Sequence, residues 1–123
     1  MKGGKAPTVH QKHWWDWLVS QGCSCCGAPA EIHHCIGSTA RHNKVHIGND
    51  FVIPLCPRHH RNEASIDKNT AQFILDYYGE ERDVTRKEME KAIFAGHVAH
   101  YRRQFEWLPV PADVLVAIEG YHR

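Results

Sequence analysis

The sequence predicts an α+β fold whose core is a short β-hairpin followed by a helix, with additional helices at both ends. Two pairs of metal-binding residue types, Cys23-x-x-Cys26 and Cys56-x-x-His59, enclose two short apolar runs that read as strands. The order is therefore a knuckle-like turn, a hairpin and a helix. Segments with a helical spacing of apolar residues lie outside this core.

The 123 residues are enough for one modest domain. We therefore treat residues 1–123 as a single domain, with a core at about 8–79 and a C-terminal helical extension at about 80–123. No stretch approaches the ~20 apolar residues of a membrane span.

Caps and apolar spacing justify the individual elements. Trp14, Trp17 and Leu18 give the first helix an apolar surface, and Gly22 ends it. In chain order we expect a helix over 8–20, a turn over 21–30, strands over 31–36 and 51–55 with a polar loop over 37–50 between them, and helices over 59–64, 69–78, 85–107 and 112–119.

The segment Thr85-Arg-Lys-Glu88 is a capping box, which opens the longest of these helices. Core packing is the expected role of its apolar face, which includes Met89, Ala92, Ile93, Val98 and Phe105. Gly96 either permits a close approach to this helix or only weakens it.

Charge is informative locally rather than in total, because the formal net charge is only +1 with histidines neutral. Arg41 and Lys44 cluster in the loop between the expected strands, and Arg58 and Arg61 flank the second histidine pair. These four residues are our candidate DNA-binding residues, since a local basic patch binds phosphates even on a nearly neutral chain. The alternative is an ordinary solvated loop.

The five cysteines favour metal binding over a disulfide framework. Their number is odd, they fall within one short segment, and the first residues lead into no apolar signal run. We therefore expect metal ligation in a reducing cytoplasm. Cys35 is expected to be a small buried apolar residue.

A structural zinc ion is expected at Cys23, Cys26, Cys56 and His59. Structural zinc sites take four tetrahedral ligands, mostly cysteine with some histidine, and two half-sites with this spacing are a specific signal. Cys25 is an alternative to Cys26 as the second ligand. A redox dithiol is the other interpretation, but the sequence lacks the βαβ pattern expected around one.

A second cluster is rich in histidine, as a hydrolytic site would be. His33 and His34 are neighbours on the first expected strand, so they point to opposite faces. His60 follows the expected zinc ligand His59 and points about 100° away from it on a helix. His33 and His60 can thus hold a divalent cation while His34 deprotonates a water, which predicts a small metal-dependent nuclease.

These residues resemble the HNH endonucleases, the ββα-metal group built on a treble clef. The match consists of Cys23-x-x-Cys26, then Glu-Ile-His33-His34, then Asp-Phe-Val-Ile-Pro-Leu-Cys56-Pro-Arg-His59-His60. These motifs are particularly similar to those of the phage recombination-enhancement nucleases that depend on RecA, the Ref group. The resemblance covers roughly residues 8–79.

The resemblance implies a one-metal hydrolysis of phosphodiester bonds. In it His33 and His60 hold the catalytic metal, Mg²⁺ or another divalent cation, and His34 is the general base. The middle asparagine of the family corresponds to Asn49, with Asp50 as the alternative. Many HNH enzymes carry a third protein ligand one turn later, where this chain has Ala64.

The resemblance also implies DNA as the substrate, a role in phage recombination or DNA processing in the cytoplasm of a bacterial host, and a RecA filament as a partner. The principal alternative is a non-catalytic zinc-binding module that docks DNA or protein. A nuclease directed at RNA and a purely structural protein are further alternatives.

Overall fold

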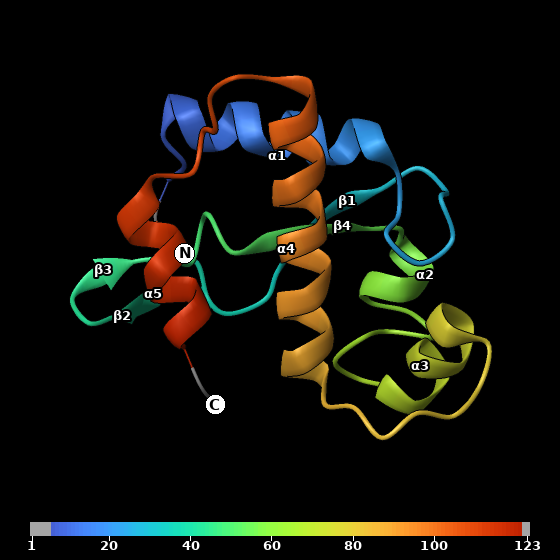
Figure 1. The fold of residues 1–123 in the computed structure, drawn as a ribbon. Helices are drawn as coiled ribbons and strands as arrows, with labels where there is room; N and C mark the ends of the chain where they lie inside the picture. Colours follow the sequence, from blue (N-terminus) through green and yellow to red (C-terminus); the bar gives the residue numbers. More distant parts are fainter. Residues whose placement is uncertain (1–5, 122–123) are drawn as a thin grey trace.

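The computed structural model describes residues 6–121 and has a mixed α+β architecture, as the sequence predicts (Figure 1). Its helices are α1 (Val9–Gln21), α2 (Pro57–His60), α3 (Thr70–Tyr78), α4 (Arg86–Gln104) and α5 (Ala112–Gly120), and its strands are β1 (Glu31–His34), β2 (Arg41–His42), β3 (Val45–His46) and β4 (Val52–Leu55).

The expected hairpin is present, because β1 pairs antiparallel with β4 in a register that places His33 opposite Ile53. The segment expected to be a polar loop is more ordered than predicted. It contains a second antiparallel pair, β2–β3, whose turn residues Asn43 and Lys44 have φ of 51° and 69°. Two successive positive φ angles are typical of the tight turns that join twisted strands.

The helix boundaries outside the hairpin are close to the expected ones. Thr8 caps α1 and Thr85 caps α4, each in a capping box, and Gly79 ends α3 in the left-handed conformation. A side-chain oxygen at such a cap accepts from a backbone N–H that has no partner within the helix. The capping box predicted at Thr85 therefore placed the start of α4 correctly.

The helix expected over 59–64 is wrong in length, since α2 is a four-residue helix that ends at His60. Ser65 explains the early end. Its hydroxyl donates to the carbonyl of His60 at 2.9 Å, and the chain then turns inward so that Ala64, Ser65 and Ile66 are fully buried. Because residues 64–66 enter the core, α2 cannot continue along the surface past His60.

The core lies where α1 and α4 pack against the β1–β4 hairpin (Figure 1). Trp14 of α1 contacts Phe94 and Tyr101 of α4 through ring edges. The expected apolar face of α4 is partly wrong, because Ala92 and Phe105 are exposed. Along residues 6–121, no helix is both long and apolar enough to cross a membrane.

Candidate metal centre and adjoining histidine site

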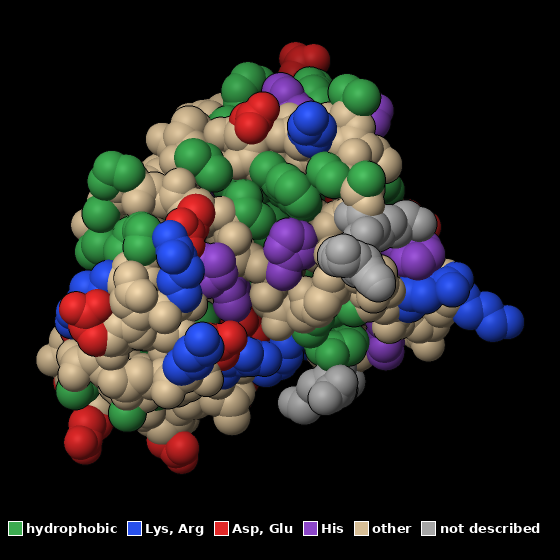
Figure 2. Space-filling view, turned by 180° about the vertical axis from the view of Figure 1, so that it is seen from behind, with side chains coloured by type: hydrophobic (Ala, Val, Ile, Leu, Met, Phe, Trp, Pro, Cys, Tyr) green, Lys and Arg blue, Asp and Glu red, His purple; other side chains and the backbone are tan. Residues whose placement is uncertain are grey.

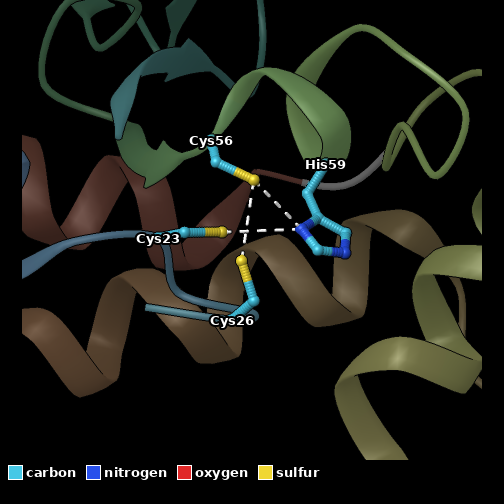
Figure 3. Close-up of side chains that lie close together, drawn as sticks. All are labelled: Cys23, Cys26, Cys56 and His59. Carbon is cyan, nitrogen blue, oxygen red and sulfur yellow. Dashed lines mark hydrogen bonds between the residues drawn. The ribbon is translucent and has the colours of Figure 1, made fainter. Parts of the chain in front are cut away.

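Cys23, Cys26, Cys56 and His59 form a compact cluster that could hold a metal ion such as zinc (Figure 3). Their four donor atoms all lie within 4.8 Å of one another. The Nδ1 atom of His59 lies 3.3 Å from the sulfur of Cys56 and 3.7 Å from that of Cys23. All four residues are among the expected zinc ligands, and three of them are buried.

Backbone contacts fix the knuckle that carries Cys23 and Cys26. Gly22 has φ of 84°, and a Cβ there would lie 2.8 Å from the carbonyl oxygen of Gly27, so the turn requires glycine. The backbone N–H of Ser24 donates to the carbonyl of Pro54 in β4 at 2.9 Å. The knuckle is thereby tied to the strand that leads directly into Cys56 and α2.

The structure separates Cys26 from Cys25, the alternative ligand. Cys26 belongs to the cluster of donor atoms and Cys25 does not. Burial raises the pKa of Cys25 to about 12 and that of Cys26 to about 11, so geometry and not acidity separates the two thiols. Burial also raises the pKa of Cys23, but N–H groups of Cys56, Cys26 and Cys25 outweigh it and lower that pKa to about 7. The environment of Cys23 therefore favours a thiolate, the form that binds zinc.

His59 has a carboxylate partner that sequence reasoning missed. Its Nε2 atom lies 2.8 Å from Oδ2 of Asp76 in α3, on the side away from the cluster. This contact lowers the pKa of Asp76, with further help from Gln72 and Arg58. A histidine that binds metal through one ring nitrogen usually gives the other to such a carboxylate.

His33 and His60, the expected ligands of a catalytic metal, lie next to each other. Their ring centroids are 5.0 Å apart. Nε2 of His33 lies 2.8 Å from Oε2 of Glu90 in α4, and Nδ1 of His60 lies 2.6 Å from Oε2 of Glu31 in β1. Glu90 was not identified from the sequence. The available signal was its place on α4, three and four residues before the buried Ile93 and Phe94.

His34 points to the other face of β1, as the alternation of a strand requires. Its Nε2 atom lies 3.0 Å from Oδ1 of Asn49, and its ring meets Trp15 of α1 edge to face. Burial lowers the pKa of His34, and the neighbouring His33 and His60 act in the same direction. These effects outweigh the hydrogen bond to Asn49, which acts to raise the pKa of His34.

Asp50, the alternative to Asn49, is placed elsewhere. Its Oδ2 atom accepts from the side-chain amide of Gln11 at 3.0 Å, and its Oδ1 atom is buried without a hydrogen bond among the described residues. Burial raises the pKa of Asp50 to about 6. The structure therefore brings Asn49, rather than Asp50, to His34.

The four candidate DNA-binding residues fall into two groups at opposite ends of the hairpin (Figure 1). Arg41 and Lys44 are exposed residues of the β2–β3 pair, which lies beside α5. Arg58 and Arg61 are on and just after α2, where they already form ion pairs, Arg58 with Glu63 and Asp76 and Arg61 with Glu31. They do not form one continuous basic patch.

Figure 2 shows the surface opposite the viewpoint of Figure 1. Histidine side chains gather near the middle of this face. They lie between an exposed hydrophobic region and, on the side of α2 and α3, a region where cationic and acidic side chains are mixed. The histidine side chains visible on this face thus lie in a region of mixed character, bordered by both apolar and charged side chains.

Comparison with known proteins gives a family but no activity. Over 84 residues the chain is 36% identical to the uncharacterized protein YdfU of Escherichia coli (strain K12), a match that covers 68% of this chain and 23% of that protein. The chain thus spans about a quarter of the length of this relative. No solved structure matches the chain. Residues 1–96 match the model of a family described as a protein of unknown function (DUF968), and the chain belongs to this family.

Proposed function

We propose that this protein is a metal-dependent HNH endonuclease that hydrolyses phosphodiester bonds in DNA. Its core would be a treble clef, with a structural zinc ion at the thiol–imidazole cluster and the ββα-metal site at the hairpin and α2. The observation that carries the proposal is a difference among four histidines. His33, His59 and His60 each have a carboxylate on one ring nitrogen, whereas His34 has the amide oxygen of Asn49.

The carboxylate partners support a role as metal ligands. A carboxylate on one nitrogen fixes the tautomer and the orientation of the ring, and leaves the other nitrogen as a lone-pair donor. His59 shows this arrangement directly, because its Nδ1 faces the thiols while Nε2 faces Asp76. His33 with Glu90 and His60 with Glu31 repeat it 5.0 Å apart.

The amide partner supports a role for His34 as general base. The oxygen of Asn49 accepts the proton on Nε2, so that Nδ1 of a neutral ring carries the free lone pair. Burial lowers the pKa of His34, which keeps the ring able to accept a proton near pH 7. In this reaction His34 takes a proton from water, the resulting hydroxide attacks the phosphorus atom, and the bond between phosphorus and the leaving oxygen breaks.

A divalent cation held by His33 and His60 would supply the remaining chemistry, neutralising charge on the phosphate and on the leaving oxygen. The donor set fits such an ion. The side chain of His60 is 26% exposed and that of Glu31 is 33% exposed, so this edge of the site is open to a substrate. Arg58 and Arg61 would then exchange their carboxylate partners for phosphates as DNA binds.

The test compares the wild type with His34→Ala on supercoiled plasmid and on single-stranded circular DNA, with Mg²⁺, Mn²⁺ or EDTA. His10→Ala is the matched control, since His10 is exposed on α1 and is outside the site. We expect metal-dependent cutting by the wild type and the control, and a loss of at least ~100-fold in His34→Ala, the scale of general-base catalysis.

The same assay is run on DNA coated with a RecA filament, because the resemblance implies that partner. Cutting on the filament alone supports a Ref-type nuclease. Equal cutting by the wild type and His34→Ala would remove His34 as the base. No cutting on any substrate, with zinc bound and the fold intact, would favour the non-catalytic zinc module.

A further inference from the structure

Glu90 is a charged residue type at a fully buried position in the middle of the molecule. Its exposed fraction is 0%, and its Oε2 atom lies 2.8 Å from Nε2 of His33, which is 3% exposed. Burying a carboxylate costs free energy unless it is paired. A glutamate retained at such a position in α4 therefore needs a reason beyond core packing.

Two cations lie near the other oxygen of this carboxylate, Oε1, which is buried and has no hydrogen bond among the described residues. Nζ of Lys87 lies 3.3 Å from Oε1 of Glu90, and Nε of Arg86 lies 3.7 Å from it. Lys87 is itself held in place, since its ammonium group donates to the carbonyl of Cys35 at 3.5 Å. Glu90 is thus fixed from one side, and its Oε2 is directed at the His33 ring.

We infer that Glu90 is a positioning residue for the metal site of His33, an inference that rests on the proposed function. Glu90 accepts the proton on Nε2 of His33 and so leaves the lone pair on Nδ1 for the metal. Asp76 bears the same relation to His59, at the same distance of 2.8 Å. Helix α4, for which the sequence indicated only core packing, thereby becomes part of the site.

A competing arrangement uses Glu90 as a direct ligand. The donor atoms of His33, Cys35 and Glu90 lie within 4.8 Å of one another and could hold a metal themselves. Burial argues against this use in catalysis, because none of the three is more than 3% exposed and a DNA phosphate cannot reach an ion among them. The positively charged Lys87 beside Oε1 also disfavours a cation there.

The test measures Mn²⁺ affinity by electron paramagnetic resonance on the zinc-loaded protein, with no substrate. The site is defined as the Mn²⁺ binding that His33→Ala abolishes. Glu90→Gln keeps an oxygen that can accept from Nε2, whereas Glu90→Met has a similar size and only a weakly accepting sulfur. We expect affinity to fall about 10-fold in Glu90→Gln and about 100-fold in Glu90→Met, the range seen when such a partner of a ligand is replaced.

Cys35→Ala is the matched control, because Cys35 is buried beside the same two side chains. Unchanged Mn²⁺ affinity in Cys35→Ala supports the positioning role. Loss of Mn²⁺ in Cys35→Ala overturns it in favour of the buried three-residue site. Equal losses of Mn²⁺ affinity in Glu90→Gln and Glu90→Met also overturn it, since the oxygen that Gln keeps would then do nothing to orient the His33 ring.

Failure of the inference and failure of the proposed function are distinguishable. A wild type that binds Mn²⁺ through His33 with the expected order of affinities, but cuts no DNA with or without RecA, refutes the nuclease and leaves Glu90 as a positioning residue of a metal site. A wild type that cuts DNA while both Glu90 variants bind Mn²⁺ normally refutes only the inference. Absence of any His33-dependent Mn²⁺ binding in the wild type overturns it outright.

Discussion

The carboxylate of Asp76 contacts the side of the His59 ring that faces away from the thiols. Oδ2 of Asp76 lies 2.8 Å from Nε2 of His59, while Nδ1 of the same ring faces the sulfurs of Cys23 and Cys56. The contact joins α3 to the cluster at the start of α2. It gives the short helix an anchor that its four residues alone do not provide.

Removal of this carboxylate is expected to weaken zinc binding without destroying the cluster. For Asp76→Ala we expect the affinity for zinc to fall by about 10- to 100-fold, because the ring of His59 loses its orienting partner. Competition with a chromophoric chelator measures the change. Asp83→Ala, at an exposed position before α4, is the control and is expected to bind zinc as the wild type does.

The two neighbouring thiols of the knuckle are expected to behave differently. Cys26→Ser removes a donor from the cluster, so less zinc should be bound and the temperature of unfolding should fall. Cys25→Ser should keep one zinc per chain, measured by metal analysis after dialysis. If Cys25→Ser lost zinc and Cys26→Ser kept it, Cys25 rather than Cys26 would be the zinc ligand. Chelation of the metal from the wild type should lower its unfolding temperature as Cys26→Ser does.

Asp50 is expected to make the protein less stable as the pH rises. Burial raises its folded-state pKa to about 6 from an ordinary value of 3.8, so its favourable contribution is complete below about pH 4 and is lost as the pH rises through 6. The shift corresponds to a cost of up to about 3 kcal/mol at pH 7. Urea unfolding of the wild type and Asp50→Asn at pH 5 and pH 7.5 should show the mutant gaining relative stability at the higher pH.

A comparison with Asp50→Asn is needed because His97 acts in the opposite direction. Burial lowers the pKa of His97 to about 4, so its contribution to stability is present above about pH 6.5 and is lost as the pH falls toward 4. In the wild type, the effects of Asp50 and His97 on the pH dependence of stability partly cancel. A relative stability of Asp50→Asn that is independent of pH would contradict the assignment to Asp50.

Two glycines are expected to respond oppositely to alanine. A Cβ at Gly96 on α4 meets no atom within 4 Å, so Gly96→Ala should raise the free energy of unfolding by roughly 0.8–1 kcal/mol through helix propensity. A Cβ at Gly48 would lie 2.1 Å from the carbonyl oxygen of Gly37, so Gly48→Ala should lower it by about 1–3 kcal/mol or more. Denaturant unfolding of both variants checks the signs. A stabilised Gly48→Ala would show that the 37–48 segment relaxes freely.

Short-range signals explain why much of the fold could be predicted. The caps Thr8 and Thr85 and the terminating Gly79 act within one helical turn, so their effect is readable from neighbouring residues. Each of the two cysteine-containing half-sites was readable for the same reason, because each lies on a single turn. The lack of contact at Gly96 also settles its role as a residue that only weakens α4.

The remaining errors concern residues whose role depends on distant partners. Glu90 looks like one of many helical glutamates until its burial against His33, 57 residues away in the chain, is seen. Asp76 likewise acquires its role from His59. The early end of α2 depends on Ser65, whose hydroxyl reaches back to the carbonyl of His60. No local pattern distinguishes these residues from ordinary polar positions.

If the proposed function is correct, the neighbouring positions of His59 and His60 imply an order in which the two metal sites form. His59 faces the thiols of the cluster, and His60 faces His33. Both lie on α2, a helix too short to form by itself. Closure of the thiol cluster around zinc is therefore what would orient His60. Under the proposed function, a newly synthesised chain would remain inert until the cluster acquired its metal, and the cell's supply of that metal would decide how much of the protein becomes active.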